Sequence, residues 1–81
     1  MRAMATAVIV YTNPGCQPCR MTKKMLDQAG ISYTEVDLSQ NEAALEHVKE
    51  LGHRQAPVVE TDSTDWSGFR PDLIAALSAN R

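Results

Sequence analysis

The sequence lacks the features of a membrane protein, a nucleic-acid-binding protein or a multidomain chain. None of its apolar runs approaches the roughly 18 residues of a membrane-spanning helix. Its 8 basic residues are scattered and are outnumbered by 10 acidic ones, so no basic surface for nucleic acid is predicted. Repeats, low-complexity tracts and linkers are also absent. We therefore expect one domain over residues 1–81, with neither nucleic acid nor a membrane as partner. Nothing in the sequence demands a dimer, so we expect a monomer.

The N-terminal residues resemble a signal peptide only loosely. Arg2 is followed by the apolar run 3–10, but this run continues directly into Tyr11 and the motif that follows. No room remains for a cleavage site and a spacer. We interpret Ala7–Tyr11 as a strand preceded by a short tail, and we expect the protein in the cytoplasm. Thiols are kept reduced there, and a close cysteine pair is more often catalytic or metal-binding than structural.

Cysteine is scarce, and both copies lie in one motif, Cys16-Gln17-Pro18-Cys19. Residues three apart on a helix share a face, with Cβ atoms about 5–6 Å apart. Disulfide-bonded cysteines usually have Cα atoms ~4.4–6.8 Å apart, so this pair can close and open without refolding of the chain. The spacing predicts a redox-active Cys16–Cys19 disulfide that takes part in thiol–disulfide exchange.

The position of the motif at a predicted helix start predicts different roles for the two sulfurs. Free N–H groups and the helix dipole favour a thiolate at Cys16, whereas Cys19 lies one turn further in. We assign Cys16 as the attacking thiolate and Cys19 as the thiol that resolves the mixed disulfide. Pro18 lacks an N–H, which leaves only that of Cys19 to bond the thiolate. We therefore expect a reduction potential nearer about −270 mV than the glutaredoxin range of roughly −200 to −230 mV.

Three other uses of the cysteines are weighed against redox chemistry. A zinc site would need His47 and His53, but 27 residues separate Cys19 from His47, where a zinc finger has about 12–15. Haem attachment needs a histidine where Arg20 stands. A structural disulfide that closes so small a loop would stabilise little. We predict no metal site, and a metal carrier that uses both thiolates is the non-enzymatic alternative.

The hydrophobic pattern predicts the order β-α-β-α-β-β-α. Strands are expected at Ala7–Tyr11, Ile31–Leu38, Pro57–Thr61 and Thr64–Trp66. Helices are expected from about Cys16 to Ala29, from a capping box at Ser39–Glu42 to Gly52, and from Pro71 onward. In the first helix, Met21, Met25 and Ala29 recur at i+4 spacing. The first two strands should be parallel and the last two antiparallel, which gives an α/β protein with a mixed four-stranded sheet flanked by three helices.

This order, with Cys-x-x-Cys after the first strand and Ala56-Pro57 before the third, resembles the thioredoxin fold in its small glutaredoxin-like form. The resemblance covers nearly the whole chain. It implies that the Ala56–Pro57 bond is cis and that Pro57 lies opposite the cysteine pair. It also implies that the backbone of Ala56 pairs with a bound thiol substrate.

The segment Trp66-Ser67-Gly68-Phe69-Arg70-Pro71-Asp72 resembles the C-terminal signature of the NrdH-redoxins, and Gln55–Val59 also fits that family. This resemblance implies a protein with no bound cofactor that receives electrons from NADPH through thioredoxin reductase. It further implies that the large subunit of class Ib ribonucleotide reductase is the electron acceptor. The second reading is a glutaredoxin that reduces mixed disulfides with a low-molecular-weight thiol. Asn13 stands where glutaredoxins commonly have lysine, and Ser67-Gly68 where they have Gly-Gly, so a glutathione site is weakened.

The residues expected to contact substrate or partner flank the cysteines or belong to the two family motifs. They are Gln17, Pro18, Ala56, Pro57, Trp66, Ser67, Gly68, Phe69 and Arg70. Trp66 and Phe69 are either core residues or an apolar docking surface. Arg70 is a solvated charge, a ligand of backbone carbonyls in its loop, or the partner of a carboxylate on another protein. Lys23 and Lys24 are most simply solvated side chains of the first helix.

Overall fold

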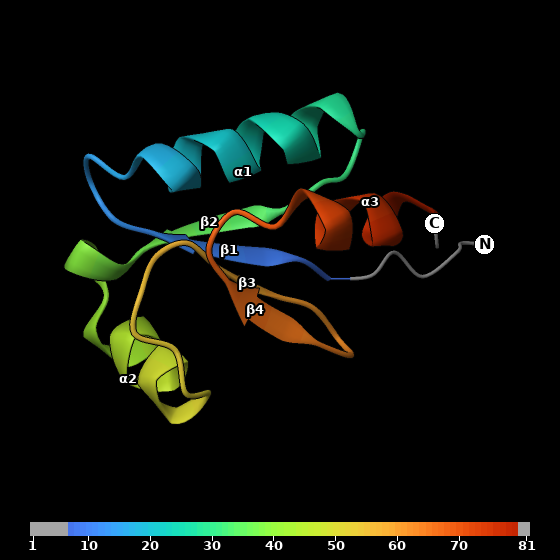
Figure 1. The fold of residues 1–81 in the computed structure, drawn as a ribbon. Helices are drawn as coiled ribbons and strands as arrows, with labels where there is room; N and C mark the ends of the chain where they lie inside the picture. The colour runs from blue at the N-terminus through green and yellow to red at the C-terminus, as the bar shows by residue number, and fades with distance from the viewer. Residues whose placement is uncertain (1–6, 80–81) are drawn as a thin grey trace.

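Four short strands form one mixed sheet in the computed structural model, which describes residues 7–79. They are β1 (Ile9–Thr12), β2 (Thr34–Asp37), β3 (Val58–Glu60) and β4 (Asp65–Ser67). The sheet order is β2-β1-β3-β4, with β1 parallel to β2 and antiparallel to β3, and β3 antiparallel to β4 (Figure 1). The predicted element order, strand directions and α/β class are confirmed, and this is the arrangement of the thioredoxin fold.

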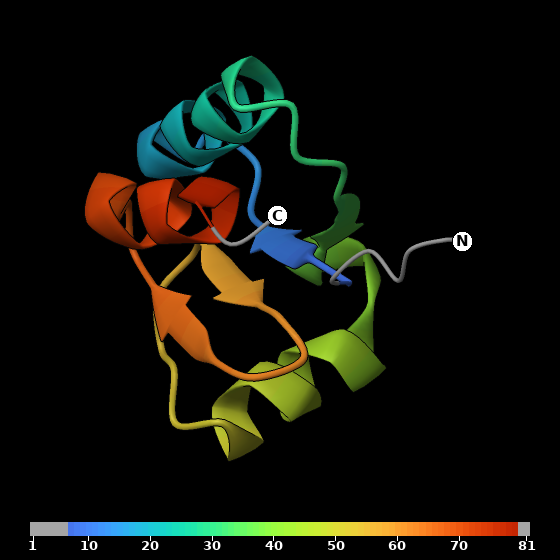
Figure 2. The same cartoon turned by 90° about the vertical axis from the view of Figure 1, so that its right-hand side faces the viewer.

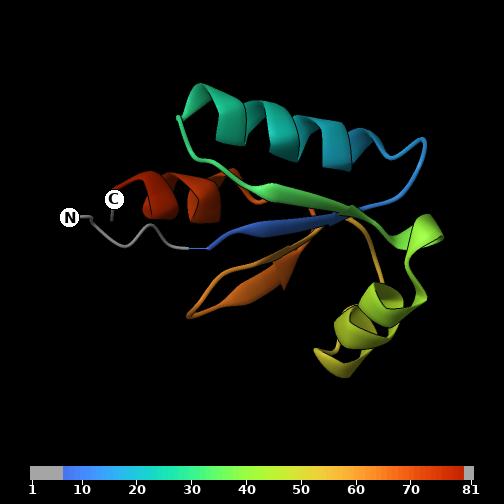
Figure 3. The same ribbon diagram turned by 180° about the vertical axis from the view of Figure 1, so that it is seen from behind.

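Three α-helices cover the two faces of the sheet. They are α1 (Gln17–Gln28), α2 (Glu42–Glu50) and α3 (Pro71–Ala79), and a 3₁₀ turn, Leu38–Gln40, joins β2 to α2. Figures 1, 2 and 3 show α1 and α3 side by side on one face and α2 on the other. Within residues 7–79, no helix combines the length and the apolarity needed to cross a membrane.

Each face of the sheet has its own hydrophobic core, because successive strand residues point to opposite sides. Under α1 and α3 the buried residues are Val8, Val10, Leu26, Ile31, Val59, Trp66 and Ile74. Under α2 they are Tyr11, Leu38, Val48 and Val58. Tyr11 also donates a hydrogen bond of 2.9 Å to Glu60, and burial followed by this bond raises the pKa of its phenol to about 12.

Several details of the predicted elements differ from the structure, and among the bounds β2 begins at Thr34 rather than Ile31 and β4 covers Asp65–Ser67 rather than Thr64–Trp66. The first strand begins at Ile9 rather than Ala7, and the tail before it, residues 1–6, lies outside the described residues. The Ser39–Glu42 capping box is wrong, because Asn41 caps α2 by accepting a 2.9 Å hydrogen bond from the N–H of Ala44. Ser39 instead belongs to the 3₁₀ turn, where its N–H and hydroxyl both donate to Asp37.

The buried side of α1 also differs from the i+4 row that supported its prediction. Met21 is 43% exposed, whereas Cys19, Thr22 and Leu26 are buried. A helix turns through 3.6 residues, so each step of four overshoots one turn by about 40° and the row does not stay on one face. Met25 and Ala29 are half-buried against the core, and Met21 is the member of the row that faces solvent. The buried residues are spaced three and four apart, which keeps them on the face that packs against the sheet.

We predict that Leu26→Ala lowers the free energy of unfolding by about 2–5 kcal/mol, because it opens a cavity at a fully buried position. The matched control is Met21→Ala on the exposed side of the same helix, which should change it by less than about 1 kcal/mol. Urea denaturation followed by circular dichroism measures both. Equal losses for the two variants would contradict this assignment of the buried face.

Candidate active site

The cysteine pair lies at the N-terminus of α1, where β1 leads through a short loop into the helix. Gly15 has a φ of 70°, a left-handed conformation that glycine adopts without steric cost. Cys16 is the N-cap, with extended backbone, and is joined to Cys19 by a disulfide with Cα atoms 5.2 Å apart. The N–H of Cys19 donates a 3.1 Å hydrogen bond to Cys16 Sγ. The expected single donor is therefore present, and Pro18 occupies the first turn without one.

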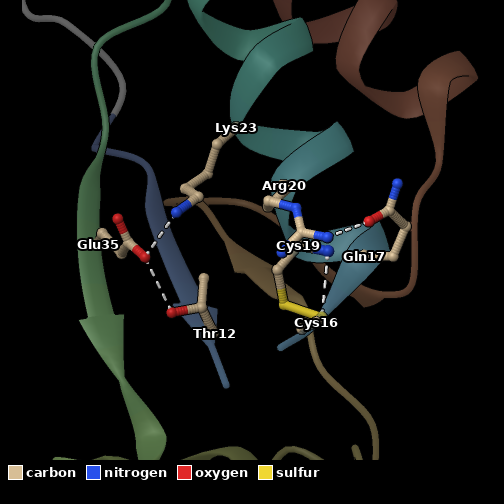
Figure 4. The surroundings of a disulfide bond; sticks show 7 residues. All are labelled: Thr12, Cys16, Gln17, Cys19, Arg20, Lys23 and Glu35. Carbon is tan, nitrogen blue, oxygen red and sulfur yellow. Dashed lines mark hydrogen bonds and ion pairs between the residues drawn. A yellow bond between two sulfur atoms is a disulfide. The ribbon is translucent and has the colours of Figure 1, made fainter. Parts of the chain in front are cut away.

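The two sulfurs differ in accessibility. Cys19 is buried, with 2% of its surface exposed, and Cys16 is half-buried. Gln17 and Pro18 between them are exposed, and Gln17 accepts a hydrogen bond from Arg20 (Figure 4). This is the order of accessibility expected if Cys16 attacks and Cys19 resolves, and the two roles remain predictions.

The Ala56–Pro57 peptide bond is cis, as the family resemblance implied. Pro57 is buried, and in the described part of the chain neither the N–H nor the C=O of Ala56 has a hydrogen-bonding partner. Asn13 lines both the groove that contains Ala56 and the cavity that contains the two cysteines. The backbone of Ala56 is thus available to pair with an extended segment of a substrate.

The Trp66–Asp72 segment supports the Pro57 loop more than it offers a docking surface. Trp66 is 6% exposed and lies in the core, so its ring has little surface to present to a partner. Gly68, with a φ of 86°, donates a 2.8 Å hydrogen bond from its N–H to the C=O of Pro57. Phe69 is half-buried against the same core, and Ser67 ends β4. A backbone hydrogen bond thus joins the Trp66–Asp72 segment to the Ala56–Pro57 motif.

Arg70 does not bond the carbonyls of its loop. Its guanidinium forms a two-pronged contact with the carboxylate of Asp72, with N–O distances of 3.2 and 3.0 Å. These two hydrogen bonds, which Arg70 donates and Asp72 accepts, raise the pKa of the guanidinium and lower the pKa of the carboxyl. The C=O of Arg70 accepts the N–H groups of Leu73 and Ile74 at the start of α3.

A cavity of about 260 Å³ beside the disulfide contains residues that the sequence did not identify as part of the site. Lys23, interpreted as solvated, lines it and forms a 2.9 Å ion pair with Glu35. Thr12 donates a 3.0 Å hydrogen bond to the same carboxylate (Figure 4). In the sequence, the four-residue spacing of Cys19 and Lys23 on one helix is the one signal that Lys23 lies near the cysteines. The positions of Glu35 and Thr12 depend on the register of β2 against β1, which the sequence does not give.

A second groove, of about 510 Å³, lies on the other side of Asn13. Its basic side chains are Lys49, His53 and Arg54. His53 contacts Asp65 at 2.6 Å, and His47 contacts Glu60 at 2.8 Å. The two histidines of the zinc hypothesis thus face separate carboxylates. No group of three or more metal-ligating side chains occurs within residues 7–79.

Replacing Pro18 by a residue with a backbone N–H should stabilise the thiolate form of Cys16. In Pro18→Ala a second N–H becomes available to Cys16 in the reduced protein, and the pKa of its thiol should fall by about 0.5. The reduction potential should rise by roughly 15 mV, because the reduced form is stabilised. Thiolate absorbance against pH and equilibration with a reference dithiol measure the two quantities.

Gln17→Ala is the control for this substitution, since it changes a neighbouring side chain and adds no backbone donor. If Pro18→Ala leaves both quantities at the control's values, the hydrogen-bond argument is wrong.

Comparisons with known proteins find a family model, curated relatives and a solved structure that match most of this chain. The family model described as glutaredoxin matches residues 8–66. Gene 56 protein of Mycobacterium phage D29 is 39% identical over 79 residues, covering 95% of this chain and 88% of that protein. Glutaredoxin-like protein NrdH of Lactococcus lactis subsp. cremoris (strain MG1363) is 38% identical over 71 residues, covering 88% and 99%. The solved structure of glutaredoxin-like NrdH-redoxin from Escherichia coli has a TM-score of 0.85 at 34% identity, covering 88% of this chain and 93% of that one.

The family model includes the sheet strands β1 to β3 and both cysteines, and the NrdH relatives match 86–88% of the chain. The chain belongs to the glutaredoxin family and, within it, to the NrdH-redoxins, which are thiol–disulfide oxidoreductases of thioredoxin fold.

Proposed function

We propose that this protein is a cytoplasmic dithiol electron carrier that thioredoxin reductase reduces at the expense of NADPH. Its proposed electron acceptor is the large subunit of class Ib ribonucleotide reductase. The observation that carries the proposal is the half-buried Cys16 at the start of α1, disulfide-bonded to a buried Cys19. Their cavity shares Asn13 with the groove that contains Ala56, whose backbone has no partner within the described residues. NADPH acts only through the reductase, and the protein holds no bound cofactor.

The reaction proceeds by two exchanges of sulfur partners. The Cys16 thiolate attacks one sulfur of the target disulfide, a mixed disulfide forms, and the other target sulfur leaves as a thiolate that takes up a proton. Cys19 then loses its proton and attacks Cys16 Sγ, which forms the intramolecular disulfide and releases the second target sulfur. Two electrons pass to the target, and the reductase returns two electrons to the pair, which restores the Cys16 thiolate and, with one proton, the Cys19 thiol.

Two features support a protein reductase in place of glutathione as the electron source. Asn13 stands where a lysine would bind a glutathione carboxylate, and Ser67-Gly68 where Gly-Gly would stand. The structure of the E. coli relative is described as the structural basis for a thioredoxin-like activity profile of a glutaredoxin-like protein. We extend that profile to this chain because the relative matches it over most of its length.

The alternative, a glutaredoxin that uses a low-molecular-weight thiol, is favoured by one observation. The groove next to Asn13 contains Lys49 and Arg54, two cations that could receive the carboxylates of such a thiol. The loss of one lysine near the cysteines therefore does not remove every cation from this side of the site.

Two reconstituted systems separate the proposals. With NADPH and thioredoxin reductase, we expect the protein to sustain reduction of a disulfide substrate over many turnovers. With NADPH, glutathione and glutathione reductase, the rate should stay near that without the protein. Replacing the substrate by the oxidised large subunit of class Ib ribonucleotide reductase tests the acceptor. Activity in the glutathione system alone would establish the alternative.

The two cysteine variants should differ in kind. Cys16→Ser removes the attacking sulfur, so turnover should fall to background. Cys19→Ser keeps the first exchange and loses the second, so it should accumulate a mixed disulfide with its target that non-reducing electrophoresis and mass spectrometry detect. Trapping by the Cys16 variant, with none by the Cys19 variant, would reverse the assigned roles.

A further inference from the structure

An ion pair shares the cavity of the cysteine pair, and three elements build it. Lys23 comes from α1, Glu35 from β2 and Thr12 from β1. Lys23 Nζ lies 2.9 Å and Thr12 Oγ1 3.0 Å from the same carboxylate oxygen, Oε2 of Glu35. Figure 4 shows the three side chains pointing toward one another beside the disulfide. One oxygen of Glu35 thus accepts both hydrogen bonds, and these bonds hold the carboxylate in place.

The fold holds these groups on the face of the sheet that α1 covers. Glu35 pairs in register with Val10, and Thr12 is two residues further along β1, so Glu35 and Thr12 are diagonal neighbours on one face. Thr12 is buried, and the side chains of Lys23 and Glu35 are 28% and 41% exposed. Lys23 follows Cys19 by one helical turn. The cation and the cysteine therefore belong to the same side of α1.

Glu35 carries its negative charge at neutral pH. The hydrogen bond from Lys23 is the largest influence on its pKa, which lies below the usual value of 4.5. Burial opposes this effect, and the hydrogen bond from Thr12 adds to it. The pair thus consists of two opposite full charges.

The charged residues that line the cavity include equal numbers of cations and carboxylates. Arg20 and Lys23 line it from α1, and Glu35 and Asp37 line it from β2. Arg20 is bonded to Gln17, and Asp37 accepts two hydrogen bonds from Ser39.

Two more titratable groups act near the ion pair from its far side. They are Asp27 on α1 and Tyr33 before β2, and Asp27, Lys23 and Glu35 all influence the pKa of the Tyr33 phenol, which burial raises most. The neutral phenol adds no charge to the cavity, so its two cations face two carboxylates.

We propose that Glu35 is a positioning residue of the redox site that holds and neutralises Lys23, and so keeps the dithiol a stronger reductant than Lys23 alone would allow. The proposal rests on the redox role of the Cys16–Cys19 pair and not on the identity of its partners. A cation near a cysteine stabilises its thiolate. The thiolate exists only in the reduced protein, so an unneutralised Lys23 would favour the reduced form and weaken its tendency to give up two electrons.

The test compares Glu35→Gln, Lys23→Met and the double variant. The measurement is the equilibrium constant for exchange of two electrons with dithiothreitol at pH 7, together with the titration of the Cys16 thiolate. Glu35→Gln leaves a cation without its partner and should favour the reduced protein by roughly two- to fivefold. Lys23→Met leaves the carboxylate and should shift the constant in the opposite direction. The double variant should return close to the wild type.

Matched controls carry the same changes outside the cavity. Lys24→Met alters the next residue of α1, and Glu46→Gln alters an exposed residue of α2, so both should leave the constant within experimental error. High salt should also reduce the effect of Glu35→Gln, because the pair is partly exposed and charges there are screened.

Opposite signs distinguish an electrostatic role from a structural one. A variant that merely loosened the site would shift the constant without reversing its sign between the two substitutions. Thermal denaturation shows which variants are folded, and if Glu35→Gln is not, Lys23→Met against Lys24→Met still tests the sign. Shifts in the same direction, or no shift in either variant, would overturn the proposal. Failure of the thioredoxin reductase assay would not, since dithiothreitol replaces every protein partner.

Discussion

The position of β1 between β2 and β3 is the constraint on which the rest of the site depends. β1 ends at Thr12, and the next four residues carry the chain to Cys16 at the start of α1. Its antiparallel partner β3 begins at Val58, directly after Pro57, so the same edge of the sheet receives the cysteine loop and the cis-proline loop. Its parallel partner β2 places Glu35 diagonally from Thr12. A slip of one residue in either pairing would turn these side chains to the opposite face.

The Trp66–Asp72 segment shows how a family motif can act through support. Its one tryptophan fills the core, and its glycine bonds the carbonyl of Pro57 through a conformation with positive φ. Arg70 and Asp72 pair with each other across the entry to α3. The motif is therefore tied to the redox site mainly because it holds the Pro57 loop against β4. The sequence alone identified this segment as a family signature, whereas its structural role is evident only from its contacts in the fold.

The amino-acid types within each segment predicted most of the helices and strands correctly. The predictions that were wrong concern features that contacts between segments determine. The β-branched run, the two-cysteine spacing and Pro71 each indicated the correct element. Ser39 and Asn41 were both able to cap α2, and the competition was settled by Asp37, which occupies the N–H and hydroxyl of Ser39. Burial of Thr22 in place of Met21 follows from the rotation of α1 on the sheet. That rotation, like the register of β2, is set by packing and leaves no local pattern.

The two hollows that meet at Asn13 differ in the charge of the residues that line them. The cavity that holds the sulfurs has two cations and two carboxylates, so the thiolate draws its stabilisation chiefly from the start of α1. The groove beside Ala56 is lined by Lys49, His53 and Arg54 and by no carboxylate, although His53 contacts Asp65 at 2.6 Å. Coulomb attraction between exposed groups acts over roughly 8 Å at physiological salt, so we expect the cations of the groove to act on an anionic group that enters it. Apart from Asn13, the two hollows are lined by different residues, so we expect a substitution in one of them to leave the charge of the other unchanged.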